Sequence, residues 1–250
     1  MRLTRKNFEF LIKNFIPKKY LFKKRILREI KKKKEPEIEL IIDLIKPETD
    51  SIDIGVYRGV HSYEMSKYSK IVHSFEPNPV IYKDLKKTLP LIINNLKIYN
   101  YALSDVNATK ILRIPIRNTN VNKINYEEFY EMGKATIHEE NKFENYENFE
   151  VKCKKLDEFE FDNLISFIKI DVEGHEISVL NGAKNIIKKF KPNLLIEIEE
   201  RHSKKNVNET INFVCSFGYN SFVLKENKLI NTNSVNNLID HNNFIFKETK

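Results

Sequence analysis

Short runs of apolar residues, alternating with segments of helical periodicity, constrain the fold of this chain more than any other feature. Buried strands that alternate with helices indicate βαβ units and a mainly parallel sheet. With 250 residues, 41% of them hydrophobic, the chain is long enough for one such domain. We therefore expect an α/β protein with a doubly wound, mostly parallel sheet. The clearest runs are 51–55 (SIDIG), 71–76 (IVHSFE), 164–171 (LISFIKID) and 192–200 (PNLLIEIEE).

The same patterns predict the other elements. Two amphipathic helices, separated at Pro17, start the chain. A third begins near Pro36, because proline suits the first turn of a helix. The predicted helices cover 5–16, 19–34, 35–45, 63–68, 80–89, 175–190 and 207–218. The remaining predicted strands cover 97–103, 109–116, 150–156, 219–226 and 242–248.

Residues 117–149 interrupt this alternation. The segment is rich in Asn and Glu, shows little periodicity, and is too long for an ordinary connection. Such a segment is either disordered or functional, and we expect it to form a lid or a substrate-binding insertion. No internal repeat or second α/β domain is evident. We predict a basic N-terminal helical arm over 1–47 and a single α/β domain over 48–250.

The charge of the chain is concentrated in this arm. The net charge is +8, yet residues 1–34 alone carry 14 Lys or Arg against 2 Asp or Glu. The arm can hold the protein against anionic lipid or a phosphate-bearing carrier. It can also bind the phosphates of a nucleic acid. The alternative is an ordinary pair of helices whose lysines are solvated.

Composition also bears on location and metals. Cys153 and Cys215 both stand in segments of apolar periodicity, and we interpret them as reduced core thiols of a cytosolic protein. No apolar run approaches the ~18 residues of a membrane helix. The N-terminus lacks the cleavage site of a signal peptide. We therefore expect a cytoplasmic protein that touches a membrane surface only through its arm. No Cys/His cluster suggests zinc, and no metal ion is predicted.

Two strand ends carry the first candidate site. Asp53, Gly55 and Gly59 end the strand 51–55, and Glu76 ends the next strand about 20 residues further on. In a doubly wound sheet, ligands bind beyond the carboxyl ends of the strands. A carboxylate at this spacing accepts hydrogen bonds from ribose hydroxyls. The alternative is a carboxylate that only solvates a turn. The spacing favours an adenosine-type ligand, although Tyr57 stands where a dinucleotide loop has its middle glycine.

A second candidate site follows the strand 164–171. Lys169, Asp171 and Glu173 share one side of the extended chain, and His175 and Glu176 come directly after them. Burying charge without a partner is costly, so a charged run at the end of an apolar strand indicates a site. The alternative is that Asp171 and Glu173 only cap the next helix.

A series of motifs runs through the α/β region in this order: DIGVYRGVHS (53–62), SFEPNP (74–79), YALSD (101–105), GKATI (133–137), KKLDEF (154–159), IKIDVEGHEISVLNGA (168–183) and PNLLIEIEE (192–200). Through these motifs the chain resembles, over roughly residues 48–248, the FkbM family of S-adenosylmethionine-dependent methyltransferases. At Val56 and Tyr57 it departs from the family pattern, which has small residues and Asn there. The resemblance implies the class I Rossmann-like methyltransferase fold, with a seven-stranded sheet, and S-adenosyl-L-methionine as the cofactor.

The resemblance also implies roles for individual residues. Asp171 would face both the transferring methyl group and the acceptor, with Glu173 and His175 beside it. Our hypothesis is that Asp171 or His175 takes the proton of the acceptor, while Lys169 holds the carboxylates in place. A divalent ion on Asp171 and a neighbouring carboxylate is the alternative. The implied cofactor-binding residues are Asp53, Gly55, Tyr57, Gly59, Glu76, Leu103, Asp105 and Asp171, and the implied acceptor-binding residues are Glu197 and Thr136.

These features favour an O-methyltransferase that acts on a sugar hydroxyl of a surface glycan or related glycoconjugate, in polysaccharide biosynthesis. Methylation of a nucleic acid or of another small metabolite is one alternative. Against nucleic acid, no basic or aromatic patch matches the arm near the predicted site. A nicotinamide-dependent oxidoreductase is the other alternative, but the middle glycine and a Tyr-x-x-x-Lys pair are missing. Acceptor identity and oligomeric state stay open.

Overall fold

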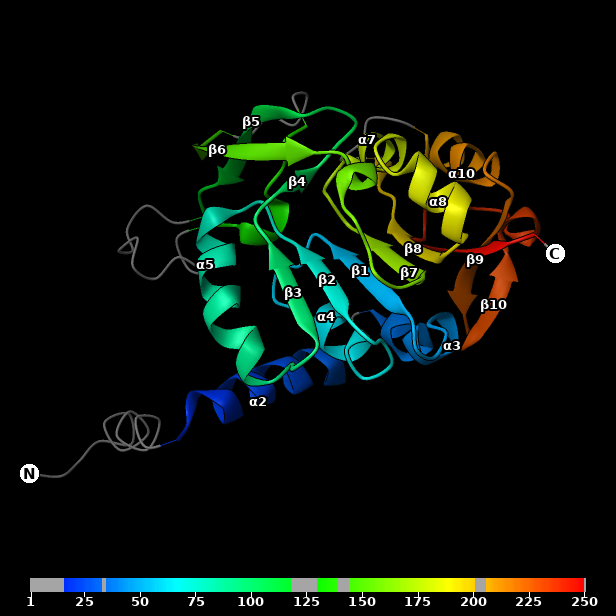
Figure 1. Ribbon diagram of the computed structural model, residues 1–250. Coiled ribbons are helices and arrows are strands. Elements are labelled where there is room, and N and C mark those ends of the chain that lie inside the picture. The colour runs from blue at the N-terminus through cyan, green and yellow to red at the C-terminus, as the bar shows by residue number, and fades with distance from the viewer. Residues whose placement is uncertain (1–15, 33–34, 118–129, 139–143, 201–205, 250) are drawn as a thin grey trace, which may run out of the picture.

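The computed structural model describes residues 16–32, 35–117, 130–138, 144–200 and 206–249. Its centre is a sheet with the strand order β10-β9-β11-β8-β7-β1-β2-β3 (Figure 1). The five strands from β8 to β3 are parallel, and β11, β9 and β10 join them in antiparallel pairs. Their bounds are β1 Asp50–Ile54, β2 Val72–Phe75, β3 Leu96–Tyr99, β7 Ile165–Ile170, β8 Asn193–Glu197, β9 Tyr219–Lys225, β10 Lys228–Asn231 and β11 Asn243–Glu248.

The predicted α/β class and the mostly parallel sheet are confirmed, but the sheet has eight strands and not seven. The additional strand is β10, which forms a tight hairpin with β9. Its two-residue turn is Glu226–Asn227, and both residues have positive φ, 51° and 60°. Hairpin turns of this kind usually contain Gly. Because Glu226 stands where glycine or asparagine is usual, the sequence did not indicate the hairpin.

Helices cover both faces of the main sheet. On one face, α3 (Ile41–Leu44) and α4 (Val60–Met65) pack with Phe167, Leu195 and Ile245. On the other face, α7 (Glu176–Asn181), α8 (Lys184–Phe190) and α10 (Val207–Cys215) pack on the isoleucines of β1 and β7. Successive side chains of a strand point to opposite faces. The apolar residues of β1 therefore enter one core, while Asp53 points toward α4.

A small second sheet lies over the carboxyl ends of β1, β2 and β3 (Figure 1). It has the strand order β4-β6-β5, with the bounds β4 Ala102–Leu103, β5 Ala108–Pro115 and β6 Tyr146–Lys154. The predicted strand 97–103 is therefore divided into β3 and β4. The reason is Asn100, whose side-chain amide donates to the carbonyls of Glu76 and Pro77 and turns the chain between the sheets.

Two further expectations are corrected. The helix predicted over 175–190 is two helices, α7 and α8, separated at Gly182. A Cβ on Gly182 would lie 1.9 Å from the carbonyl oxygen of Ser104, so the chain passes too close to the small sheet for a side chain there. The insertion predicted over 117–149 is shorter, since β6 begins at Tyr146. Residues 118–129 and 139–143 of that insertion lie outside the described residues.

The N-terminal arm is packed against the body. Most of the first predicted helix, 5–16, lies outside the described residues. The second is α2 (Lys18–Lys31), which contacts α4 and α5 (Pro79–Thr88) through the fully buried Ile26. The third predicted helix is a short 3-10 helix, η1 (Pro36–Leu40), followed by α3. Ile41, the first residue of α3, is fully buried. Residues on both sides of the predicted division at residue 47 therefore share one apolar core.

None of the helices in the described ranges is long and apolar enough to cross a membrane. Both cysteines are free thiols. Cys153 is buried in β6, whereas Cys215, at the end of α10, is half-buried.

Candidate active site

The carboxyl ends of β1 and β7 meet at Gly55 and Asp171. The Asp171 N–H donates to the carbonyl of Ile54 at 3.0 Å. Gly55 has φ of +82°, and a Cβ there would lie 1.8 Å from the carbonyl oxygen of Asp171. Only glycine allows this approach, because it has no side chain and accepts positive φ. The two sites predicted at the ends of strands 51–55 and 164–171 therefore lie next to one another in the structure.

The side chain of Lys169 contacts both strand ends at this junction. Its side chain is buried, and Nζ donates to the Gly55 carbonyl at 2.7 Å and to Oδ2 of Asp171 at 3.1 Å. Nζ also lies 3.7 Å from Oδ1 of Asp53. Burial alone would lower the pKa of Lys169, but the charges of Asp171, Asp53 and Glu35 outweigh burial and raise it. Lys169 is therefore a permanent cation between two carboxylates.

Asp53 is fully buried under the loop that follows β1. One of its carboxylate oxygens accepts a hydrogen bond from Ser62 on α4, and Ser62 also contacts Ser74 on β2. Burial raises the pKa of Asp53, and the charge of Lys169 opposes this shift. The residue was predicted to bind the cofactor. In the structure, Asp53 contacts Ser62 on α4 and Lys169 beneath the loop. Its role toward the cofactor stays a prediction.

Glu76 directly follows β2, and its carboxylate joins the loop after β1 to the loop after β2. Oε2 accepts the Tyr57 N–H at 3.0 Å, and Oε1 accepts the Asn78 N–H at 2.9 Å. Asn78 in turn caps α5 by accepting the N–H groups of Val80 and Ile81. Burial raises the pKa of Glu76 to about 7, although these two N–H groups lower it. This strand end therefore presents a buried carboxylate.

Three adjoining cavities surround these residues. The first is mostly apolar and includes Phe75, Leu103, Val172 and His175. The second includes Glu76, Asp171 and Glu173. The third is the largest of the three, about 340 Å³, and includes Asp171, Lys169, Glu35 and His61. Gly55 lines all three, and the residues that also connect them are Tyr57, Pro77, Leu112, Ala135, Asp171 and Val172.

The structure places His175 at the apolar cavity and not with the carboxylates. Nε2 of His175 lies 2.9 Å from the hydroxyl of Ser104, which stands between the implied cofactor-binding residues Leu103 and Asp105. Burial, helped by the charge of Lys110, lowers the pKa of His175 to about 4, so the imidazole is neutral at pH 7. Leu103 lines the same cavity, whereas Asp105 contacts the Ser104 hydroxyl behind it.

Asp171, Glu173 and Glu197 form an acidic cluster in which one oxygen of each lies within 4.8 Å of the others. Burial raises the pKa of Glu197, as do the charge of Asp171 and the hydrogen bond between the two carboxyl groups. Burial would also raise the pKa of Asp171, but the charge of Lys169, together with the hydrogen bonds from Glu197 and Lys169, lowers that pKa. At neutral pH, Asp171 is thus ionised and Glu197 holds a proton. Three carboxyl oxygens at this spacing also suit a divalent ion, the alternative kept above.

Thr136 links the small sheet to the loop after β7. Its hydroxyl donates to the Glu173 carbonyl at 2.9 Å and accepts the His138 N–H at 3.0 Å, and its backbone pairs with Arg113. The side chain is buried by these contacts. Thr136 therefore fixes the described part of the insertion, 130–138, above the second cavity, which Met132, Gly133 and Ala135 line.

The sequence patterns indicated only some of the residues that form the loop after β1 and the walls of the cavities. Tyr57 has φ of +48°, is 40% exposed, and lies against Gly133. Gly59, with φ of +74°, starts α4 and is packed against Leu89, so it shapes the loop from the side opposite the cavities. Other residues on the cavity walls were not predicted. Arg58 and His61 stand in the first motif but were given no role there, and the others lie outside every motif: Arg25, Glu35 and Arg117.

Comparisons with known proteins give the family of the chain. A family model described as the methyltransferase FkbM domain matches residues 53–221. No match was found among curated proteins. Among solved structures, the chain is similar to a methyltransferase FkbM of Methylobacillus flagellatus KT, with 14% identity and a TM-score of 0.46. That match covers 84% of this chain but only 50% of the other.

Two further solved structures are similar in size as well. One is an rRNA methylase of Streptococcus thermophilus, with 11% identity and a TM-score of 0.46, where the match covers 86% of this chain and 95% of the other. The second is a Streptococcus mutans protein in complex with SAH, with 10% identity and a TM-score of 0.47. There the match covers 85% of this chain and 94% of the other.

Proposed function

Since the chain belongs to the FkbM methyltransferase family and uses S-adenosylmethionine, we propose that it transfers the methyl group to a hydroxyl oxygen of a sugar in a surface glycan or related glycoconjugate. The observation that carries this proposal is the position of Asp171. Its ionised carboxylate lies at the junction of β1 and β7 and lines both the second and the third cavity. It is therefore accessible from the cofactor side and from a larger polar space.

The residues on the walls fit the cofactor. An apolar cavity bordered by Phe75, Leu103 and Val172 suits an adenine ring. The buried carboxylate of Glu76 stands in the next cavity, where it can accept hydrogen bonds from ribose hydroxyls. Beyond it, Gly55 leaves the backbone open at the end of β1. The order adenine, ribose and methionine thus follows the order of the cavities from the first toward the third.

The bound cofactor supplies a methyl group that its sulfonium already activates. What the protein has to add is mainly the alignment of the acceptor oxygen. An aliphatic hydroxyl is barely acidic, so a base that takes its proton as the C–O bond forms assists the reaction. Asp171 is the group placed for this, because Lys169 keeps it charged and fixes Oδ2. The neutral His175 stands at the adenine end, so we assign the base role to Asp171 alone.

The third cavity supports a polyol as the acceptor. It offers about 340 Å³ and polar groups that come from three separate segments: Glu35, His61, and Lys169 with Asp171. Burial raises the pKa of Glu35 and lowers that of His61 to about 3, so the histidine is neutral. Neutral and acidic groups of this kind donate and accept hydrogen bonds in the way that sugar hydroxyls require.

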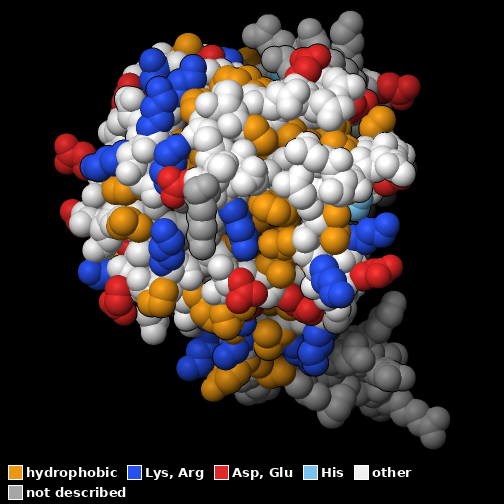
Figure 2. All heavy atoms as spheres, turned by 90° about the vertical axis from the view of Figure 1, so that its right-hand side faces the viewer, with side chains coloured by type: hydrophobic (Ala, Val, Ile, Leu, Met, Phe, Trp, Pro, Cys, Tyr) orange, Lys and Arg blue, Asp and Glu red, His pale blue; other side chains and the backbone are white. Residues whose placement is uncertain are grey.

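We also propose that the basic N-terminal arm binds the protein to an anionic carrier or membrane surface. The exposed side chains of α2 are largely basic, and Figure 2 shows Lys and Arg beside hydrophobic residues at the lower end of the molecule, where α2 lies. Basic side chains near a membrane attract anionic lipids. The exposed basic residues of this helix and its end are Lys19, Lys23, Lys24, Arg28, Lys31 and Lys32.

The proposed reaction can be tested in cells that make a surface glycan. Mass spectrometry of the glycan would be compared between cells with the wild-type protein and cells with Asp171→Asn. One sugar that carries a methyl group only with the wild-type protein is the expected result. Methylation of RNA or of a small metabolite, with an unchanged glycan, would contradict the proposal. Calorimetric titration with S-adenosylhomocysteine and with NAD tests the cofactor separately.

A further inference from the structure

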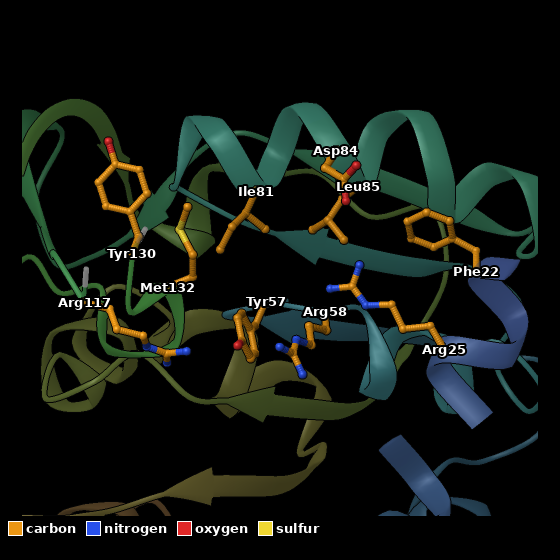
Figure 3. Close-up of a pocket in the computed structure, with 10 residues that line it drawn as sticks. All are labelled: Phe22, Arg25, Tyr57, Arg58, Ile81, Asp84, Leu85, Arg117, Tyr130 and Met132. Atoms are coloured by element: carbon orange, nitrogen blue, oxygen red, sulfur yellow. The ribbon is translucent and has the colours of Figure 1, made fainter. Parts of the chain in front are cut away.

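Beside the three cavities is a fourth, whose polar lining is mainly cationic. Arg25 comes from α2, Arg58 from the loop after β1, and Arg117 from the chain after β5. In Figure 3, Arg25 extends toward Leu85 and Asp84, while Arg58 and Arg117 extend toward the ring of Tyr57 from its two sides. Three arginines from distant parts of the sequence thus share one wall.

For two of these arginines, Arg58 and Arg117, the acidic partners in the described ranges are distant. The closest ion pair of Arg58 places its Nη1 3.6 Å from Oε2 of Glu29, which is longer than a hydrogen bond. Nε of Arg58 is buried and has no hydrogen-bond partner within the described ranges. Arg117 lies 4.0 Å from Glu131, which Lys134 holds at 2.6 Å. Asp84 is the one acidic residue on the described wall.

The rest of the wall is apolar and aromatic. It strengthens the electric field of the arginines, because low-polarity surroundings screen charge less than water does. The Arg58 guanidinium lies 5.1 Å from the Tyr57 ring centroid, and that of Arg25 lies 5.8 Å from the Phe22 ring, so aromatic faces orient both. The apolar and aromatic lining residues are Phe22, Tyr57, Ile81, Leu85, Tyr130 and Met132.

This cavity adjoins the active site. Tyr57 and Met132 also line the second cavity, while Arg58 and Arg117 also line the third, to which Asp171 belongs. A ligand in the third cavity can therefore extend to the arginines without leaving the protein. Fixed guanidinium groups match the oxygens of phosphate and bind them with two parallel hydrogen bonds each.

We propose that the cavity of Arg25, Arg58 and Arg117 binds a phosphate group of the methyl acceptor. The acceptor is then a phosphorylated sugar, held by its phosphate at the arginines while a hydroxyl reaches Asp171. This inference rests on the proposed function and adds the charge of the substrate to it. The phosphate oxygens are the same in a soluble sugar phosphate and in a lipid-linked carrier.

The test is calorimetric titration of inorganic phosphate at low ionic strength into the full chain, with and without saturating S-adenosylhomocysteine. Wild-type protein should bind phosphate in both conditions. Arg58→Gln and Arg117→Gln should each weaken phosphate binding about tenfold, the size expected for a lost charge-assisted hydrogen bond. Lys188→Gln is the matched control for the loss of one positive charge, because Lys188 is exposed on α8 and outside the cavity; it should bind like the wild type.

Three results would overturn the inference: no phosphate binding by the wild type, equal binding by all variants, or loss of phosphate when S-adenosylhomocysteine is bound. The last would place the arginines on the carboxylate of the cofactor. S-adenosylhomocysteine affinity, measured for each variant, shows that the fold and cofactor site are intact. Failure of the wild type to bind S-adenosylhomocysteine would instead contradict the proposed function, and the titration without it still tests the arginines.

Vesicles separate the two sources of phosphate. Sedimentation with vesicles containing phosphatidic acid, compared with vesicles of phosphatidylcholine alone, should depend on Arg58 and Arg117 if the carrier is a lipid. If both variants sediment like the wild type while failing to bind inorganic phosphate, the acceptor is a soluble sugar phosphate. Either result supports the arginine cavity as the phosphate site.

Discussion

The ammonium group of Lys169, near the end of β7, lies 3.1 Å from Oδ2 of Asp171, the residue that directly follows this strand. Both side chains point to the face that carries α4, because residues two apart on a strand share a side. The pair is largely shielded from solvent, so its attraction is screened little. This ion pair keeps Asp171, the proposed base, negatively charged.

Lys169→Met should raise the pKa of Asp171, since the cation that lowers it is removed. Turnover should fall about tenfold to a hundredfold at neutral pH, in the range of a disturbed general base. The acidic limb of the plot of kcat against pH should move upward. Lys188→Met, an exposed change on α8, is the control. An unmoved acidic limb in Lys169→Met would show that Asp171 does not carry the reaction.

Asp171→Asn should lower kcat about 10²- to 10⁴-fold at saturating acceptor, because the amide cannot take the proton. S-adenosylhomocysteine should still bind, since the junction of β1 and β7 depends on the backbone N–H of Asp171. Steady-state kinetics and calorimetry measure the two effects separately. Asp162→Asn, at a position 88% exposed, is the matched control. Full turnover by Asp171→Asn would exclude the proposed role.

Glu76→Gln should weaken the binding of S-adenosylhomocysteine about tenfold, the effect of losing charge on one hydrogen-bonding partner. The glutamine can still accept from Tyr57 or Asn78, so the loop after β1 keeps most of its contacts. Calorimetry measures the affinity, and thermal unfolding without ligand checks the fold. An unchanged affinity would place the ribose away from β2.

Glu176→Gln should change how stability depends on pH. Burial raises the pKa of Glu176 from its ordinary value of 4.5 to about 7, partly opposed by N–H groups of its own loop. Between these values the folded state binds more protons than the unfolded state, so this group makes stability fall as pH rises. The stability of wild type relative to Glu176→Gln should therefore decrease from about pH 4.5 to about pH 7.

Urea unfolding of both proteins across this range gives that difference. Comparing the two proteins removes the contribution of His175 and of other groups that titrate in both. Glu209→Gln, an exposed change on α10, is the control. A pH-independent difference between wild type and Glu176→Gln would mean that the buried carboxyl does not titrate in this window.

Gly55→Ala should destabilise the protein by more than about 2 kcal/mol, because the new Cβ would meet the Asp171 carbonyl and the backbone has positive φ. Gly133→Ala is the matched control. Its Cβ would lie 3.6 Å from the Tyr57 ring, an ordinary contact distance. Chemical denaturation of both variants gives the two free energies of unfolding. Equal losses would show that the approach of β1 to β7 is not tight.

The main sheet and the strand ends were predictable because they depend on local patterns. Apolar runs defined β1, β2, β7 and β8, and parallel strands bring their carboxyl ends to one edge. That topology alone places Gly55, Glu76 and Asp171 near one another. Elements without a local signal were missed or misread, such as β10, whose hairpin turn contains no glycine, and the break between α7 and α8.

The sequence by itself therefore determined the family, the α/β fold and the strand-end residues, since each is encoded by residues close together in the chain. Only the tertiary structure decided that His175 lies at the apolar cavity with Ser104 and that Lys169 bridges Asp53 and Asp171. It also decided that Arg25, Arg58 and Arg117 share a wall. The physical reason is that these relationships join segments far apart in the chain, and packing between helices, loops and the second sheet sets them.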